Sequence, residues 1–198
     1  MTKAAHLALL EHDNADKTLF GFWVYIMTDC ILFASLFAVY AVLHGSTFSG
    51  PSGRELFSLP YVLTETLLLL TSSYTVGLGL LAARRKDAQT TVVWLLVTAL
   101  LGAAFLFLET TEFRHLAAEG NSWRRSGFLS SFFALVGTHG LHITIGLLWL
   151  GVMLPRLLKK GITDISAKRL ELFSLFWHFL DIIWIFIFTI VYLMGAIS

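Results

Sequence analysis

Eight ionisable residues lie inside long apolar stretches of this sequence, and six of them form pairs spaced three residues apart. The pairs and the two single residues are Glu109 with Glu112, His139 with His142, His178 with Asp181, and Asp29 and Glu65. Residues three apart on a helix project from the same face. Ionisable groups inside a bilayer are costly and usually face a polar partner. Metal binding, proton transfer or a hydrogen-bonded layer that positions helices are therefore the chemistries to consider.

Five apolar segments carry these residues, at about 20–43, 60–83, 92–113, 128–154 and 172–195. Each is long enough to cross a bilayer as a helix, which takes roughly 20 residues. A closed barrel would need short alternating strands, and these runs do not alternate. The chain is 57% hydrophobic and 14% charged, with a mean hydropathy of +0.76. The sequence therefore predicts an all-α, polytopic membrane protein, with residues 1–198 forming one bundle of five transmembrane helices.

Basic residues set the expected orientation of this bundle. Ten of the fourteen Lys and Arg residues lie before the first segment, at 84–86, or between 156 and 169. Short loops rich in Lys and Arg remain in the cytoplasm. We therefore expect a cytoplasmic N-terminus and an outer C-terminus. Residues 1–19, too polar for a signal sequence, are expected to form a short cytoplasmic tail, and the Gly-, Ser- and Pro-rich stretch 44–59 an irregular outer loop.

The helical rise of about 1.5 Å per residue gives the depth of each polar group. Asp29 lies roughly 13 Å inside the cytoplasmic end of the first segment on that rise. His142, His178 and Asp181 come to the same level on the last two segments. The three glutamates at 65, 109 and 112 lie toward the outer side, and His139 lies between the levels. Depth thus predicts a layer of four inner groups, separate from the outer carboxyl groups.

The depths argue against a metal site that joins all three pairs, because the levels are more than roughly 10 Å apart and a coordination sphere is about 2 Å in radius. Three interpretations of these groups stay open. The first is a smaller metal site built from Asp29, His142, His178 and Asp181. A proton relay is a second interpretation. The residues favour the third, a polar layer that fixes the helices or holds a lipid headgroup.

Independent redox or hydrolytic chemistry finds little support in the sequence. Three intramembrane histidines are too few for a haem with two axial histidines plus a histidine-bound copper. Phosphate-binding, nucleophile-elbow and zinc-protease motifs do not occur. The single cysteine, Cys30, lies in an apolar run and is expected to be buried. We therefore predict no catalytic residue, metal ligand or cofactor-binding residue in this chain.

Close packing is predicted around the fourth segment. Ala134, Gly137 and Gly140 recur there at intervals of three, and small residues let helix backbones approach closely. Trp177, on the last segment, is expected to pack inside the bundle. The fourth segment is therefore the candidate central helix.

Two long stretches carry a family resemblance, FFALVGTHGLHITIG (Phe132–Gly146) and ELFSLFWHFLDIIWIFIFTIVYLMG (Glu171–Gly195). With FGFWVYIMTDCILFASLFAVY in the first segment and FLETTEF at the end of the third, they resemble subunit III of the haem-copper terminal oxidases. The resemblance covers nearly the whole chain. Within that family the five-helix form, at about this length, is most similar to subunit III of the bacterial cytochrome o ubiquinol oxidases.

The resemblance implies a subunit of a proton-pumping quinol oxidase of the aerobic respiratory chain in the bacterial inner membrane, with its C-terminus in the periplasm. It implies that haem and copper reside in subunit I, which this chain contacts and stabilises, and that subunits II and IV complete the complex. It also implies phospholipids in a cleft between the first two helices and the remaining three. Asp29 stands where many relatives have a reactive glutamate, one methylene longer.

We therefore expect a non-catalytic subunit III, with Asp29 hydrogen-bonded to His142. One alternative is subunit III of a five-helix cytochrome c oxidase. The others are a self-contained transporter or proton channel, and a membrane metalloenzyme.

Overall fold

The computed structural model describes residues 3–47, 56 and 58–197, and five long helices account for most of them. They are α1 (Lys3–Leu43), α3 (Leu59–Arg84), α4 (Ala88–Ala118), α5 (Gly127–Lys160) and α6 (Asp164–Ile187). A π-helical turn, η1 (Phe188–Leu193), and the short α7 (Met194–Ile197) continue α6. None of the described residues forms a strand. The prediction of an all-α chain with five helices able to span a membrane is confirmed.

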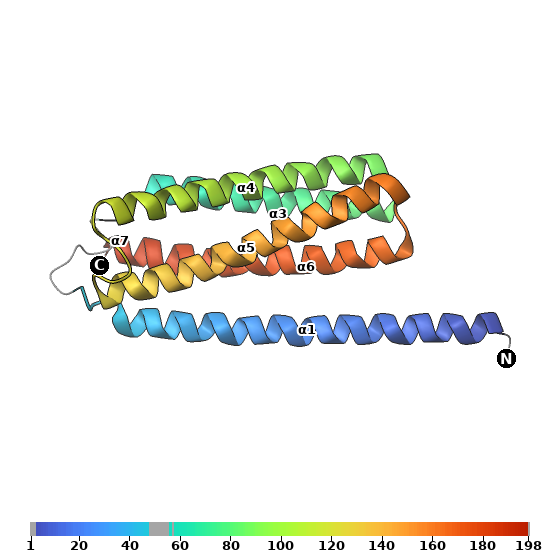
Figure 1. Cartoon of the computed structure of the whole chain (residues 1–198), viewed down its shortest axis with the longest axis horizontal. Helices are drawn as coiled ribbons and strands as arrows, with labels where there is room; N and C mark the ends of the chain where they lie inside the picture. The colour runs from blue at the N-terminus through green and yellow to red at the C-terminus, as the bar shows by residue number, and fades with distance from the viewer. Residues whose placement is uncertain (1–2, 48–55, 57, 198) are drawn as a thin grey trace.

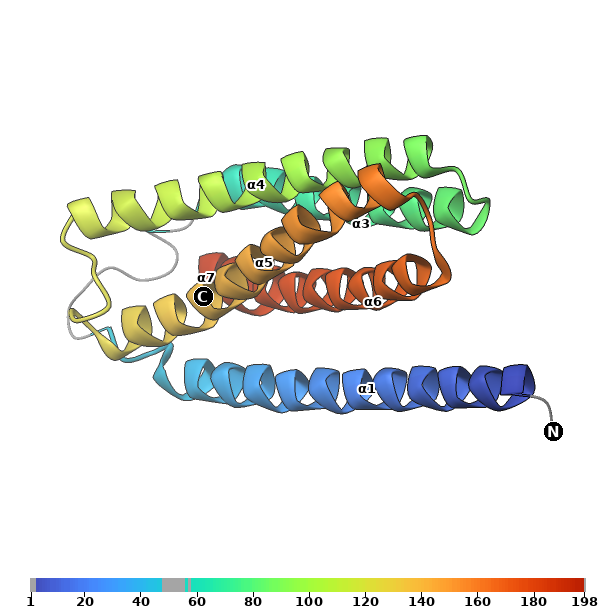
Figure 2. The ribbon, with the colours of Figure 1, turned by 45° about the vertical axis from the view of Figure 1, so that its right-hand side comes forward.

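The five long helices run side by side along one axis, and neighbours in sequence alternate in direction (Figure 1). α3 packs on α4 and α6, and α5 packs on α1, α4 and α6. α1 lies along one edge of the bundle and packs mainly on α5 (Figures 1 and 2). The N-terminus and the α3–α4 and α5–α6 turns share one end, opposite the C-terminus. The basic segments therefore gather at one end, whereas the side of the membrane that this end faces stays a prediction.

The helices extend beyond the apolar segments that predicted them. α1 is helical from Lys3, so the expected tail continues the first helix at its N-terminal end. α4 and α6 begin earlier than expected because capping side chains satisfy their first N–H groups: Asp87 accepts from Thr90 N, and Thr163 and Ser166 form a reciprocal capping box. Hydropathy indicates which part of each helix lies in lipid, whereas the capping residues determine where the helix begins. Most of the predicted irregular loop, at 48–55 and 57, lies outside the described residues.

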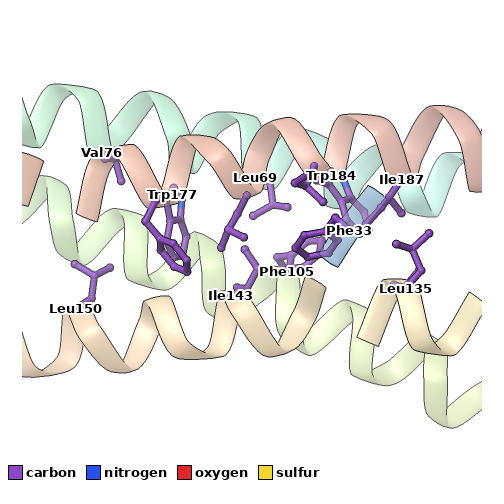
Figure 3. Packing of buried hydrophobic residues seen from close by; sticks show 14 of the residues in the cluster. Phe33, Leu69, Val76, Phe105, Leu135, Ile143, Leu150, Trp177, Trp184 and Ile187 are labelled. Atoms are coloured by element: carbon purple, nitrogen blue, oxygen red, sulfur yellow. The ribbon is translucent and has the colours of Figure 1, made fainter. Parts of the chain in front are cut away.

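Trp177 packs closely against two neighbouring helices inside the bundle, as its predicted packing role requires. Its indole ring is 1% exposed and lies between Gly102 on α4 and Gly146 on α5. A Cβ atom at Gly102 would lie 2.9 Å from Trp177 Cη2, and one at Gly146 would lie 2.8 Å from Cζ3. Figure 3 shows the ring projecting from α6 into the centre of the apolar core. Glycine is therefore needed at both positions to admit the indole ring.

The predicted stripe of small residues on α5 does not form one contact surface. Ala134 is exposed, and a Cβ at Gly137 would lie an ordinary 3.7 Å from Phe113 Cε2. Only Gly140 is closely packed, against the carboxyl group of Glu109. The reason is geometric, because at 3.6 residues per turn a six-residue step rotates the side chain by about 120°. Cys30, expected to be buried, is also exposed.

The resemblance implied that a cleft separates the first two long helices from the remaining three. The structure groups the helices differently. α3 is joined to α4 and α6 by hydrogen bonds inside the bundle, so it does not stand apart with α1. Thr75 Oγ1 lies 2.8 Å from Thr98 Oγ1, and Trp184 Nε1 donates to Thr66 Oγ1 at 3.0 Å. Only α1 is set apart, and 22% of its most apolar stretch is buried against 50% for α3.

Candidate functional site: the intramembrane polar groups

Asp29 and His142 face each other between α1 and α5. His142 Nε2 lies 3.6 Å from Asp29 Oδ2, and both side chains are buried. The hydrogen bond predicted between them is not formed at this distance, and no other described group bonds Oδ2. His142 Nδ1 lies 2.7 Å from the Thr138 carbonyl oxygen one turn earlier, so Nδ1 carries the proton. The carbonyl group therefore aims Nε2 at the carboxyl group.

His139 lies one turn away from that pair, in an apolar cage. Its ring is 0% exposed and packs against Phe33, Phe105 and Trp184, with its centroid 5.2 Å from that of Trp184. Neither ring nitrogen has a hydrogen-bond partner among the described residues. Figure 3 shows the three aromatic side chains gathered at one level of the core. Its surroundings among the described residues therefore offer aromatic packing and no polar partner.

Glu65, Glu109 and Glu112 form a separate group near the end of the bundle that holds the C-terminus. Glu65 and Glu109 are 0% and 2% exposed, and no described group bonds their carboxyl oxygens. The three carboxyl groups are close enough to interact electrostatically. Glu109 also lies against Gly140, where a Cβ would come within 2.6 Å of both carboxyl oxygens.

The π-helical turn η1 supplies the partner of the third glutamate. Tyr192, fully buried, donates its hydroxyl hydrogen to Glu112 Oε2 at 2.9 Å. A π-helical turn rotates the residues that follow it relative to an ordinary α-helix and often occurs at a functional position. The turn thereby joins the end of the α6 segment to α4.

His178 and Asp181 do not join the polar layer predicted for them. His178 is exposed, and its Nδ1 lies 2.8 Å from Ser73 Oγ on α3, while Asp181 is half-buried one turn further along α6. The prediction that His178 shares one polar layer with Asp29 and His142 is therefore wrong. The core side of α6 at this level is filled by Trp177 and Leu180, so the neighbouring polar residues point elsewhere.

The four inner groups accordingly separate into two sites on different helix pairs. Asp29 and His142 join α1 to α5, whereas His178 and Asp181 lie beside α3. In the part of the chain that the structure describes, no three His, Cys, Asp or Glu side chains come together closely enough to hold a metal ion. The four side chains of the smaller metal site that the sequence left open therefore do not come together in the described part of the chain.

Sequence reasoning missed the hydroxyl groups of α3. Ser72 accepts a hydrogen bond from Trp177 Nε1 at 3.0 Å, Thr66 accepts one from Trp184 Nε1, and Ser73 Oγ shares one with His178 Nδ1. The signal was present, because Thr66 and Ser73 lie seven residues apart in an apolar segment, a spacing that repeats one helix face about every two turns. Trp177 and Trp184 show the same seven-residue spacing on the partner helix.

Comparison with known proteins gives a consistent family assignment. The family model described as cytochrome c oxidase subunit III matches residues 9–196. The chain is 56% identical over 186 residues to cytochrome bo(3) ubiquinol oxidase subunit 3 of Pseudomonas aeruginosa, covering 94% of this chain and 89% of that protein. It is 46% identical over 181 residues to the protein of that name from Buchnera aphidicola, covering 91% and 93%.

A relative with a different electron donor in its name is also similar. Cytochrome c oxidase subunit 3 of Bacillus sp. PS3 is 45% identical over 178 residues, covering 90% of this chain and 86% of that protein. These similarities extend over nearly the full length of each protein. The range matched by the family model, residues 9–196, contains every polar group described above.

Proposed function

The chain belongs to the cytochrome c oxidase subunit III family, and on that premise we propose that it is the non-catalytic subunit III of a proton-pumping ubiquinol oxidase. Its five spanning helices fit a multi-pass protein of the bacterial inner membrane. Oxidation of ubiquinol and reduction of oxygen to water belong to the whole complex. In this proposal, this chain provides a contact surface for the neighbouring subunits, and the redox centres lie elsewhere in the complex.

The observation that carries this proposal is the exposed polar face at His178. His178 lies near the middle of the span Asp164–Leu193, where a bilayer would surround an isolated chain. Asp181, beside it, has a buried carboxyl oxygen without a hydrogen-bond partner among the described residues. An aspartate at the centre of a spanning helix costs about 2.5–3.5 kcal/mol on insertion scales. A neighbouring subunit that covers this face would remove it from lipid, so the isolated chain is an incomplete unit.

The electron donor follows from the pattern of relatives. The ubiquinol oxidase subunit of Pseudomonas aeruginosa is 56% identical to this chain, whereas the cytochrome c oxidase subunit of Bacillus sp. PS3 is 45% identical. A quinol oxidase subunit of Bacillus subtilis, at 44%, is about as distant as the latter. The lower identity of the Bacillus sp. PS3 subunit therefore reflects overall sequence divergence and does not indicate its electron donor. The relatives with higher identity are ubiquinol oxidase subunits, which favours quinol as the donor.

Haem and copper belong, in this proposal, to subunit I, which this chain contacts and stabilises, with subunits II and IV completing the assembly. The intramembrane histidines of α5 support that division, because aromatic rings surround His139, whereas His142 bonds the Thr138 carbonyl oxygen through Nδ1 and faces the Asp29 carboxyl group with Nε2. We also propose that phospholipids cover the apolar sides of α1. Phe20, Met27 and Ile31 are each at least 60% exposed there.

The test is purification of the tagged chain from native membranes in mild detergent. A visible spectrum with haem bands, together with ubiquinol oxidation, is expected; a cytochrome c oxidase would instead oxidise reduced cytochrome c. His178→Phe should lower the amount of this chain per haem while leaving turnover per retained complex unchanged. Tyr74→Phe, which removes an exposed hydroxyl group from α3, serves as the control. Proton conduction by the chain alone in liposomes would refute the proposal and support a self-contained channel.

A further inference from the structure

A small pocket lies where α3 ends and α4 begins. Its volume is about 170 Å³, and its walls include Leu78, Leu81, Arg85, Asp87 and Trp94. The membrane-spanning parts of the two helices end at Arg84 and begin at Ala88, so the charged walls lie at the level of lipid headgroups. The leucines lie one to two turns deeper along α3. The pocket therefore opens at the boundary between headgroups and acyl chains.

The pocket presents one positive and one negative group that are not paired with each other. The guanidinium group of Arg85 forms no ion pair or hydrogen bond with the described part of the chain, in contrast to that of Arg84, which lies 3.7 Å from Glu171 Oε1. Asp87 accepts hydrogen bonds from Thr90 N at 3.1 Å and Thr90 Oγ1 at 2.6 Å. These bonds hold the pKa of Asp87 below its ordinary value, so the carboxylate stays charged at neutral pH.

The volume of the pocket and the chemistry of its walls limit the class of ligand that it can bind. Pockets for whole drug-sized molecules usually exceed about 300 Å³, and this one is smaller. Trp94 is half-buried and its indole N–H is not engaged by any described group, which is the usual arrangement of tryptophan at a membrane interface. Leu81 is 48% exposed and extends the apolar wall toward the membrane interior. The pocket thus suits a compact polar head whose hydrocarbon part lies outside, along α3.

We propose that this pocket binds the zwitterionic headgroup of an amine-bearing phospholipid, with its phosphate on Arg85 and its ammonium group on Asp87. A guanidinium group binds phosphate oxygens through charge-assisted hydrogen bonds. A primary ammonium group donates up to three hydrogen bonds and can reach a carboxylate that already accepts two. Phosphatidylethanolamine has both groups on one short linker, whereas phosphatidylglycerol lacks the cation. This site rests on the membrane placement of the chain and is distinct from the lipids proposed around α1.

Native mass spectrometry of the delipidated complex, titrated with dioleoyl-phosphatidylethanolamine, tests the proposal. One basic residue near a membrane surface contributes about 1 kcal/mol to the binding of an anionic group. Arg85→Gln should therefore lower the ratio of lipid-bound to lipid-free complex about fivefold at fixed lipid concentration. Arg84→Gln is the matched control, one residue away and paired with Glu171, and it should leave this ratio unchanged. Equal loss in both variants, or in neither, would overturn the site.

A second variant separates the amine from the phosphate. Asp87→Asn keeps a side-chain oxygen for capping α4 and removes the negative charge. It should abolish the preference for phosphatidylethanolamine over phosphatidylglycerol and leave phosphatidylglycerol binding intact or stronger. If the wild-type complex binds both lipids equally, the assignment to an amine is refuted. Haem content and ubiquinol turnover, measured on the same samples, report separately on the proposed oxidase role.

Discussion

Replacing Gly146 by alanine tests how closely α5 and α6 must approach. The new Cβ would lie 2.8 Å from Trp177 Cζ3, 3.1 Å from Trp177 Cε3 and 3.2 Å from Phe176 Cε1. Carbon atoms pack best at about 3.5–4.0 Å, so all three contacts are too short. The indole ring cannot retreat toward α4, because Gly102 already lies against its far edge. Its N–H group is also held by Ser72. Relief therefore requires a shift of the α5 or α6 backbone.

The size of the effect follows from two opposing contributions. Overpacking a well-filled core costs about 1–3 kcal/mol. Alanine in place of glycine stabilises a helix by roughly 0.5–1 kcal/mol. Gly151, on the same helix, has nothing within 4 Å of a built Cβ, so Gly151→Ala receives only the second contribution. The unfolding free energies of the two variants should thus differ by about 1–3 kcal/mol, with Gly146→Ala the less stable.

The assay is equilibrium unfolding in mixed detergent micelles, followed by tryptophan fluorescence and circular dichroism. Adding Trp177→Phe removes the ring atoms that clash, so the double variant should be more stable than the sum of the single effects predicts. Coupling of about 0.5–3 kcal/mol is usual for residues in contact. Equal stability of Gly146→Ala and Gly151→Ala, or strict additivity in the double variant, would refute the packing described for Trp177.

Four further outcomes are expected. Asp29→Ala should weaken retention of this chain in the purified complex more than it lowers turnover, measured as chain per haem and oxygen consumption per haem; normal retention with lost turnover would contradict this. Gly140→Ala should destabilise the chain more than Gly137→Ala in the same unfolding assay, because only the former meets a carboxyl group, within 2.6 Å. The pKa of Asp87 is lowered from 3.8 by hydrogen bonds from Thr90, so its contribution to stability is present above that pH and lost as the pH falls through the folded-state value; Thr90→Val should reduce this acid sensitivity in a pH series of unfolding curves. Metal analysis of the isolated chain should find no stoichiometric metal, and one bound ion per chain would revive the metalloenzyme interpretation.

Hydropathy and helical rise predicted the parts of this structure that depend on one helix at a time. The five spanning segments follow from length and composition alone. The approach of Asp29 to His142 followed from counting residues inward from the ends of two antiparallel helices. The distance of 3.6 Å departs from the predicted hydrogen bond by a few tenths of an ångström, a margin that side-chain rotamers decide and depth cannot.

The rotation of each helix about its own axis could not be predicted in the same way. A helix that is apolar on all sides does not reveal which side faces protein and which faces lipid. For α6 the depth of His178 was estimated, but its direction was set by the bulk of Trp177, which needs the space opened by Gly102 and Gly146. Those glycines lie on two other helices, far away in sequence. Their role appears only once the neighbours of α6 are known.

The weak attachment of α1 connects these observations to the proposed role. Two polar contacts between described residues join α1 to α5 and η1: the 3.6 Å approach of Asp29 to His142 and the 3.4 Å hydrogen bond from Tyr40 to the Val191 carbonyl oxygen. Lipid tails are as apolar as the side chains of α1, so burial gives little drive for association inside a bilayer. Packing and these contacts must therefore hold α1, and a partner or ordered lipid against its exposed side would add to them. Loss of the Asp29 carboxyl group should for this reason loosen α1 first and reach catalysis only through the assembly.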